Sequence, residues 1–121
     1  MKWAKDLETT KAKQANGLLK DDNGGYCCLG RACIVGGLKS DRNNMYDGED
    51  KYLPYSIMKK MGIKNYNPVF VLDEEDNKIL NKVNPYNIYA IGYKTSLSYL
   101  NDTGLSFKEI AKIIRKHYKE L

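Results

Sequence analysis

The central stretch of the chain, residues 16–37, reads NGLLKDDNGGYCCLGRACIVGG and combines a turn signal with a run of small apolar residues. The Asn-Gly-Gly sequence at 23–25 tolerates the positive φ angles that a tight hairpin requires. The stretch therefore predicts a β-hairpin over residues 17–28. The apolar run that follows predicts a helix over 28–36, because two glycines at its end are typical of a helix C-terminus.

Helical periodicity and capping signals predict further helices on both sides of this centre. The clearest lies at the C-terminal end, where Ser106 and Glu109 form a capping-box pattern that opens a helix over 105–121. Pro54 is best tolerated in a first helical turn and favours a helix over 54–61. The other expected elements are helices over 2–15 and 96–102, a strand over 67–72, and a strand or buried loop over 86–91. Residues 39–51 are predicted to be a polar loop with little to bury.

The length and composition are those of one small folded domain over residues 1–121. A chain of 121 residues is long enough for one hydrophobic core. Hydrophobic residues make up 42% and charged residues 29%, which excludes the collagen, coiled-coil and disordered classes. No apolar run approaches the roughly 20 residues of a membrane helix, and the first residues lack the apolar segment of a secretory signal. We therefore expect an α+β domain, with a small antiparallel sheet packed by three to five helices, that acts inside the cell without a membrane partner.

Positive charge is concentrated at the two ends of the chain. The formal net charge is +5, and residues 1–20 and 105–121 each hold five basic residues against two carboxylates. Such an excess is compatible with an anionic partner, although a solvated helix face is the simpler interpretation. The outward side of the last helix would present Lys108, Lys112, Arg115, Lys116 and Lys119.

The residue types that usually carry catalysis or metal binding are sparse. Cys27, Cys28 and Cys33 are an odd number within seven positions and match no common zinc spacing. Buried, reduced cysteines without metal are expected, because free cysteine is among the most buried residue types. His117, the single histidine, is expected to be exposed near the C-terminus. The acidic run 73–77 lacks the ligand spacing of a calcium loop and is expected to be a solvated turn. The sequence therefore predicts no enzyme, no metal and no cofactor.

Several short blocks, spread from Trp3 to Ile114, follow one pattern. The pattern resembles a family of small bacteriophage and prophage proteins. That family reads roughly as Trp, Gln-x-x-Gly-x-Leu, Tyr/Phe-Cys-Cys-Leu-Gly, Leu-Pro, Leu-Asn-Asp and Phe-x-x-Ile-Ala. The matching blocks here are Trp3, Gln14 to Leu19, Tyr26 to Gly30, Leu53-Pro54, Leu100 to Asp102, and Ser106 to Ala111. The resemblance implies a phage accessory protein in the host cytoplasm and brings no catalytic residues.

Phage accessory proteins of this size commonly act by binding, so we favour a non-enzymatic counter-defence protein. By analogy of lifestyle, it would sequester an anionic ligand, most simply a nucleotide immune signal. The alternatives are a protein–protein inhibitor of a host or defence factor and a nucleic-acid-binding protein. Self-association into a homo-oligomer is left open.

The candidate ligand-binding residues follow from charge and hydrogen-bonding capacity. Arg31 lies inside an apolar stretch, where a charge needs a partner. That partner is expected to be either a ligand phosphate or an internal carboxylate, Asp6 or Asp102. Asn101 and Asp102 form the best polar pair, and helix capping is their simpler role. The full candidate set is Arg31, Lys13, Gln14, Lys112, Arg115, Lys116 and Asn101.

Overall fold

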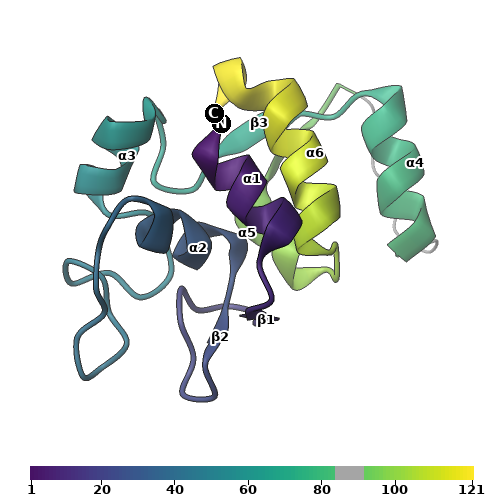
Figure 1. Cartoon of the computed structure of the whole chain (residues 1–121). Helices are drawn as coiled ribbons and strands as arrows, with labels where there is room; N and C mark the ends of the chain where they lie inside the picture. The colour runs from purple at the N-terminus through teal and green to yellow at the C-terminus, as the bar shows by residue number, and fades with distance from the viewer. Residues whose placement is uncertain (84–91) are drawn as a thin grey trace.

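The computed structural model describes residues 1–83 and 92–121 (Figure 1). The elements are α1 (Lys2–Thr9), β1 (Lys13–Gln14), β2 (Gly25–Tyr26), α2 (Cys28–Val35), α3 (Tyr55–Met61), β3 (Val69–Val71), α4 (Glu74–Val83), β4 (Lys94–Ser96), α5 (Leu97–Asp102), α6 (Phe107–His117) and the short 3-10 helix η1 (Tyr118–Glu120). The fold is α+β, as the sequence predicts. The expected element over 86–91 lies outside the described residues. Among the residues described, no helix has both the length and the apolar character needed to cross a bilayer.

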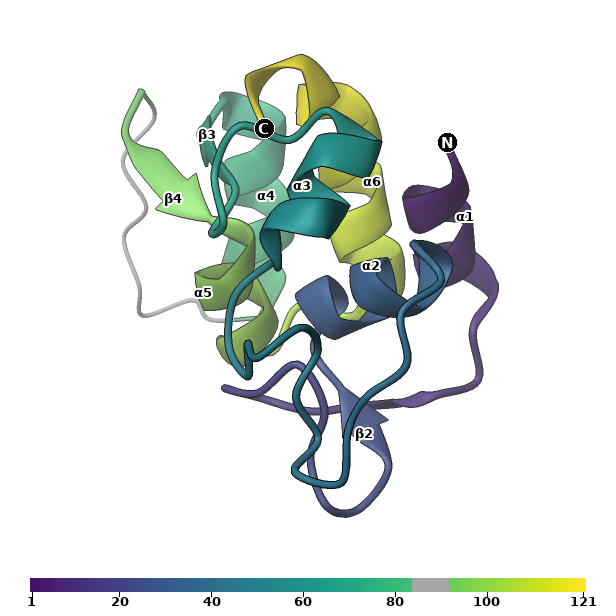
Figure 2. The same ribbon diagram turned by 90° about the vertical axis from the view of Figure 1, so that its left-hand side faces the viewer.

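Helix α6 forms the middle of the core. It begins at the predicted capping box, in which Ser106 Oγ accepts from Glu109 N and Glu109 Oε1 accepts from Ser106 N. Helices α1 and α6 lie side by side, and α2 packs against α1 (Figures 1 and 2). The buried core cluster includes Trp3, Leu29, Cys33, Phe107 and Ile110.

The predicted hairpin over 17–28 is wrong in its pairing. Strand β2 pairs in parallel with β1, and the antiparallel part is a single bridge between Lys20 and Tyr26. The turn itself forms, because Asp21 N donates to Gly25 O at 2.9 Å. The strand before the turn does not form because Leu19 is fully buried and its N–H donates to Asp50 O at 2.7 Å instead of to a neighbouring strand.

The extents of the other elements differ from the predictions mainly at the first helix. Helix α1 ends at Thr9 rather than at residue 15, because Thr10 adopts an extended conformation and the following residues form β1. The helices predicted over 28–36, 54–61 and 96–102 are α2, α3 and α5. The strand predicted over 67–72 is β3, which pairs antiparallel with β4.

Two segments predicted to be solvated loops contribute to the folded interior. Helix α4 replaces the acidic turn over 73–77, because Asp73 and Asp76 cap it reciprocally: each side chain accepts from the other residue's N–H, at 3.0 and 3.1 Å. Carboxylates in a first helical turn are also favoured by the helix dipole. Within the loop 39–51, Tyr46 is fully buried in the core.

Candidate functional site

Asn101 lies at the centre of a buried hydrogen-bond network at the end of α5. Its Oδ1 accepts from Cys28 N at 3.1 Å and from Gln14 Nε2 at 2.9 Å, and its Nδ2 donates to Ala15 O at 2.7 Å. Asn101 is only 1% exposed, so these bonds are shielded from water. The structure therefore brings two of the predicted ligand-binding residues, Gln14 and Asn101, together as an internal connection between segments.

Gln14 extends this network to the start of α6. Its Nε2 also donates to Leu105 O at 2.7 Å, and its Oε1 accepts from Phe107 N at 3.1 Å. Beside it, Gly17 N donates to Asp102 Oδ1 at 3.0 Å. The first N–H groups of a helix have no partner within the helix, so Asn101 on Cys28 N and Gln14 on Phe107 N act as remote caps of α2 and α6. We call Gln14, Ala15, Cys28, Asn101, Leu105 and Phe107 the Asn101 network.

Several of the sequence blocks that carry the family resemblance contribute residues to this network or contact it. Trp3 Nε1 donates to Cys28 O at 2.9 Å, which ties α1 to the first turn of α2. A Cβ at Gly30 would lie 1.8 Å from Leu19 O, so only glycine permits this approach of backbone to helix. The blocks therefore have a structural explanation that requires no ligand.

Arg31 forms a bidentate ion pair with Asp6, one of the two internal partners considered for it. Its Nε and one terminal nitrogen donate to the two Asp6 oxygens at 2.9 and 2.8 Å. The guanidinium also lies over the Tyr26 ring, 5.0 Å from the centroid. A ligand phosphate would compete with Asp6 for both of these donors.

Carboxylates from other elements interrupt the basic side of α6. Arg115 pairs with Glu8 of α1 at 2.6 Å, and Lys116 pairs with Asp73 at 2.5 Å. Lys13 and Lys112 are exposed. Lys112 borders a small cavity of about 140 Å³ together with two carboxylates of α4. The predicted cationic residues of α6 are thus divided between surface ion pairs and solvent.

The three cysteines are buried and free of disulfides, as predicted. Burial raises the pKa of the Cys27 thiol to about 11 and that of Cys33 to about 12. Burial also raises the pKa of the fully buried Cys28 thiol. Thiols with such pKa values are protonated at neutral pH, and the thiolate is the nucleophilic form.

His117 is buried, so the prediction that it is exposed is wrong. It is 6% exposed because α6 packs its last turn against β3 and α4, with the Phe70 ring 4.6 Å from the imidazole. Its Nε2 lies 2.7 Å from Asp76 Oδ2, and its Nδ1 lies 2.7 Å from Glu120 Oε1. Two carboxylates on opposite ring nitrogens favour the imidazolium, which can donate to both.

The arrangement around His117 can also be considered as a metal site, because Asp73, Asp76 and His117 offer ligand atoms within 4.8 Å of one another. Lys116 Nζ lies 2.5 Å from Asp73 Oδ2 and 3.7 Å from Asp76 Oδ1. The Lys116 ammonium and the His117 imidazolium of the chain itself therefore already pair with these carboxylates. The group is best described as an internal salt-bridge cluster that joins α4 to α6.

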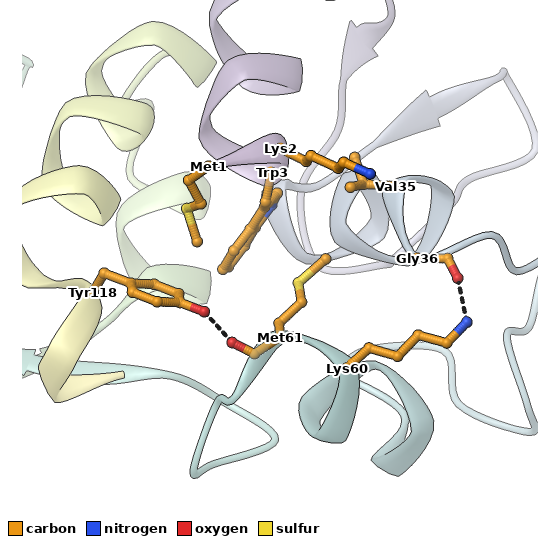
Figure 3. Close-up of a pocket in the computed structure, with 8 residues that line it drawn as sticks. All are labelled: Met1, Lys2, Trp3, Val35, Gly36, Lys60, Met61 and Tyr118. Atoms are coloured by element: carbon orange, nitrogen blue, oxygen red, sulfur yellow. Dashed lines mark hydrogen bonds between the residues drawn. The ribbon is translucent and has the colours of Figure 1, made fainter.

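A cavity of about 410 Å³ opens between the start of α1, the ends of α2 and α3, and η1 (Figure 3). It is lined by Met1, Lys2, Trp3, Val35, Gly36, Lys60, Met61 and Tyr118. The Trp3 ring lies between the Met1 and Met61 side chains in this view. None of these lining residues is acidic, and two are lysines. The residues of this site come from four separate elements, so no local sequence pattern indicates it.

Two hydrogen bonds fix opposite sides of this cavity. Lys60 Nζ donates to Gly36 O at 2.8 Å, which holds the ammonium group beside the end of α2. On the other side, Tyr118 Oη donates to Met61 O. The side chain of Lys2 extends toward Val35, so both lysines lie on the α2 side (Figure 3). The site therefore combines an apolar wall with a cationic edge.

A model of one protein family matches residues 1–118, nearly the whole chain. The chain belongs to the DUF8296 family, described as a domain of unknown function. No curated protein and no solved structure matches it. The matched range of the DUF8296 model includes both the Asn101 network and every residue that lines the 410 Å³ cavity.

In this DUF8296 chain, the stability should depend on pH through the cluster around His117. Burial works to lower the His117 pKa, but hydrogen bonds to Glu120 and Asp76 outweigh it and raise the net pKa above the ordinary value. The hydrogen bond from Lys116 lowers the Asp73 pKa to about 2. The imidazolium likewise lowers the Glu120 pKa.

The sign of the pH dependence follows from these directions. The raised pKa of His117 contributes to the free energy of unfolding. This contribution is complete below the pKa of the unfolded chain, roughly 6.5, and is lost as the pH rises through the pKa of the folded state. The carboxylate contributions are present above about pH 4 and are lost on acidification. We therefore expect the free energy of unfolding to be greatest between about pH 5 and 6, as measured by urea denaturation across a pH series. His117→Gln should flatten the decline above pH 6, and an unchanged slope in that variant would contradict the assignment.

Proposed function

We propose that this chain is a non-enzymatic binding protein that sequesters a small anionic ligand in the cavity between α1, α2, α3 and η1. A nucleotide is the ligand class we favour. The observation that carries the proposal is the composition of the cavity lining, in which Lys2 and Lys60 accompany apolar and aromatic side chains and no carboxylate is present.

The chemistry of the lining suits a ligand with an anionic group and an apolar or aromatic body. Lysine ammonium groups bind phosphates as point charges. The Met1 and Met61 thioethers and the Tyr118 ring offer soft contact surfaces for a flat ring. A volume of about 410 Å³ also falls within the range of small-molecule sites. The formal net charge of +5 would favour the approach of an anion.

Sequestration requires binding but no chemical reaction. The protonated thiols and the hydrogen-bonded histidine agree with such a role. The buried thiols have raised pKa values, and His117 is held between two carboxylates. We therefore propose binding without turnover, in the setting that the resemblance implies: a phage accessory protein that counters host defence in the host cytoplasm.

Direct nucleic-acid binding through α6 is the less favoured alternative, because Arg115 and Lys116 already have carboxylate partners. Salt distinguishes the two modes. Binding of a nucleic acid loses about one unit of log K per phosphate contact for each unit of log salt concentration. A small ligand with one or two lysine contacts should show a much weaker dependence.

A thermal-shift screen with a panel of mono-, di- and cyclic nucleotides tests the proposal. A nucleotide at about 100 times its Kd should stabilise the protein by roughly 2.7 kcal/mol, or about 10 °C in Tm. The double variant K2A/K60A should lose at least about tenfold in affinity for the same nucleotide, because two charged contacts are removed.

The matched control is K108A/K112A, which removes the same charge from the exposed side of α6. This control should bind the nucleotide like the wild type. Equal losses in both double variants would point to non-specific charge attraction and would contradict the cavity site. Absence of any nucleotide-induced shift, together with co-purification of a host protein, would instead favour the protein–protein inhibitor.

A further inference from the structure

Another cavity, of about 470 Å³, lies beside α3, and half of its lining residues are tyrosines. Tyr52, Tyr55 and Tyr66 line it, and their exposed fractions are 37%, 76% and 60%. Leu53 and Met58 complete the apolar part of the lining, and Glu49 supplies a carboxylate. This cavity shares no lining residue with the 410 Å³ cavity. Three exposed aromatic rings therefore gather around one hollow.

The rings of Tyr52 and Tyr66 form a corner. Their centroids are 5.4 Å apart and their planes are inclined by 60°. Two inclined aromatic faces can contact one compact group from two directions, and each face carries partial negative charge. A flat ligand would instead be favoured by a pair of parallel rings, which this corner does not provide.

Backbone hydrogen bonds hold the walls of the cavity in place. Leu53 N donates to Tyr66 O at 2.8 Å, which joins the two segments that carry the paired rings. Glu49 and Tyr46 exchange two backbone hydrogen bonds at 2.9 Å, and the Tyr46 side chain is fully buried. Glu49 is therefore anchored to the core through its turn. A site formed before binding loses less entropy when a ligand enters.

The charge of the cavity lining favours a cation. Glu49 is the one charged residue of this lining, and Asp47, Asp50 and Lys51 lie near it in sequence but do not line the cavity. Neither lysine nor arginine is among its lining residues. A quaternary ammonium group donates no hydrogen bonds, so aromatic faces and one carboxylate can satisfy it fully. We infer that this tyrosine cavity, defined by Glu49, Tyr52, Tyr55 and Tyr66, binds the quaternary ammonium group of a small molecule.

An NMR titration with choline, compared with its uncharged isostere 3,3-dimethylbutan-1-ol, tests this inference. Choline should shift the backbone amide signals of Leu53 and Tyr66, and the isostere should bind at least about tenfold more weakly because it lacks the charge. Equal binding of the two compounds would show a non-specific apolar hollow and overturn the inference. Absence of any shift with choline would overturn it as well.

Two variants assign the binding to the tyrosine cavity. Tyr66→Leu removes one ring of the corner, and Glu49→Gln removes the carboxylate without changing its size. Each should weaken choline binding several-fold. The matched control is Tyr93→Leu, which removes another strongly exposed ring, 71% against 60% for Tyr66, that does not line the cavity. A loss of the same size in Tyr93→Leu would overturn the assignment. The dispersed spectrum of each variant verifies its fold, and Glu49→Gln decides the matter if Tyr66→Leu is unfolded.

Discussion

Gly30→Ala is expected to abolish the stable folded state. The added Cβ would lie 1.8 Å from Leu19 O and 2.7 Å from Leu19 C, which are backbone atoms of a residue buried in the core. Neither atom can move without displacing the segment before β2. We expect a loss of more than about 4 kcal/mol, a large part of the 5–15 kcal/mol typical of small proteins.

The expected destabilisation by Gly30→Ala is opposite in sign to the usual effect of alanine in a helix. Gly30 lies within α2, where replacing glycine by alanine ordinarily stabilises a helix by roughly 0.5–1 kcal/mol. Circular dichroism and urea denaturation of the variant measure the outcome. Gly36→Ala is the matched control, because its nearest contact is the end of the Ile57 side chain, which can rotate. A Gly30→Ala protein as stable as the wild type would show that α2 does not pack on Leu19 as described.

The elements that sequence analysis predicted well are those specified by nearby residues. The Ser106–Glu109 capping box is formed by residues three positions apart, and α6 begins where that pattern places it. The apolar residues of this helix recur at helical spacing, and Phe107 and Ile110 among them are buried in the core. Pro54 likewise marks the start of α3, because proline is tolerated in the first turn of a helix. Local signals of this kind do not depend on knowing the tertiary structure.

The pairings that sequence analysis missed depend on residues far apart in the chain. Asp73 and Asp76 carry a local capping signal for α4, but the run was compared only with the ligand spacing of a calcium loop and was therefore assigned to a solvated turn. Because these residues were assigned to a turn, the sequence did not indicate that Asp76 of α4 would hydrogen-bond His117, which lies 41 residues away in the chain. The parallel pairing of β1 with β2 was missed because a turn with good hairpin residues favours an antiparallel neighbour.

In the candidate site, too, the contacts depend on residues that are far apart in the chain. Gln14 and Asn101 were selected as polar residues able to bind a ligand, but each is used internally, across 87 positions of sequence. Lys2 and Lys60 were not selected, because an isolated lysine carries no signal. Only the packing of α1, α2, α3 and η1 brings them to one cavity. Residue chemistry led to the hypothesis of an anionic ligand, and the cavity that we propose for it depends on contacts between elements far apart in the chain.

Asn101→Ala is expected to destabilise the protein by roughly 3–5 kcal/mol, because it leaves several buried polar groups without partners. Cys28 N would lose its acceptor, and Ala15 O would lose its donor. Gln14 would keep its bonds to Leu105 and Phe107 but would lose the one that joins it to α5. The Asn101 network would then no longer connect the start of α2 with the end of α5.

The measurement is the free energy of unfolding from urea denaturation, with Asp102→Asn as the control. Asp102 is the exposed neighbour of Asn101, and an asparagine there still offers an oxygen to Gly17 N, so its effect should stay below about 1 kcal/mol. If Asn101 has a structural role, the free energy of unfolding should be much lower for Asn101→Ala than for Asp102→Asn. If Asn101→Ala were as stable as the wild type yet lost nucleotide binding, the residue would belong to a ligand site, as its polarity alone suggested. Among the residues that the structure describes, the Asn101 side chain makes four hydrogen bonds, and these favour the structural outcome.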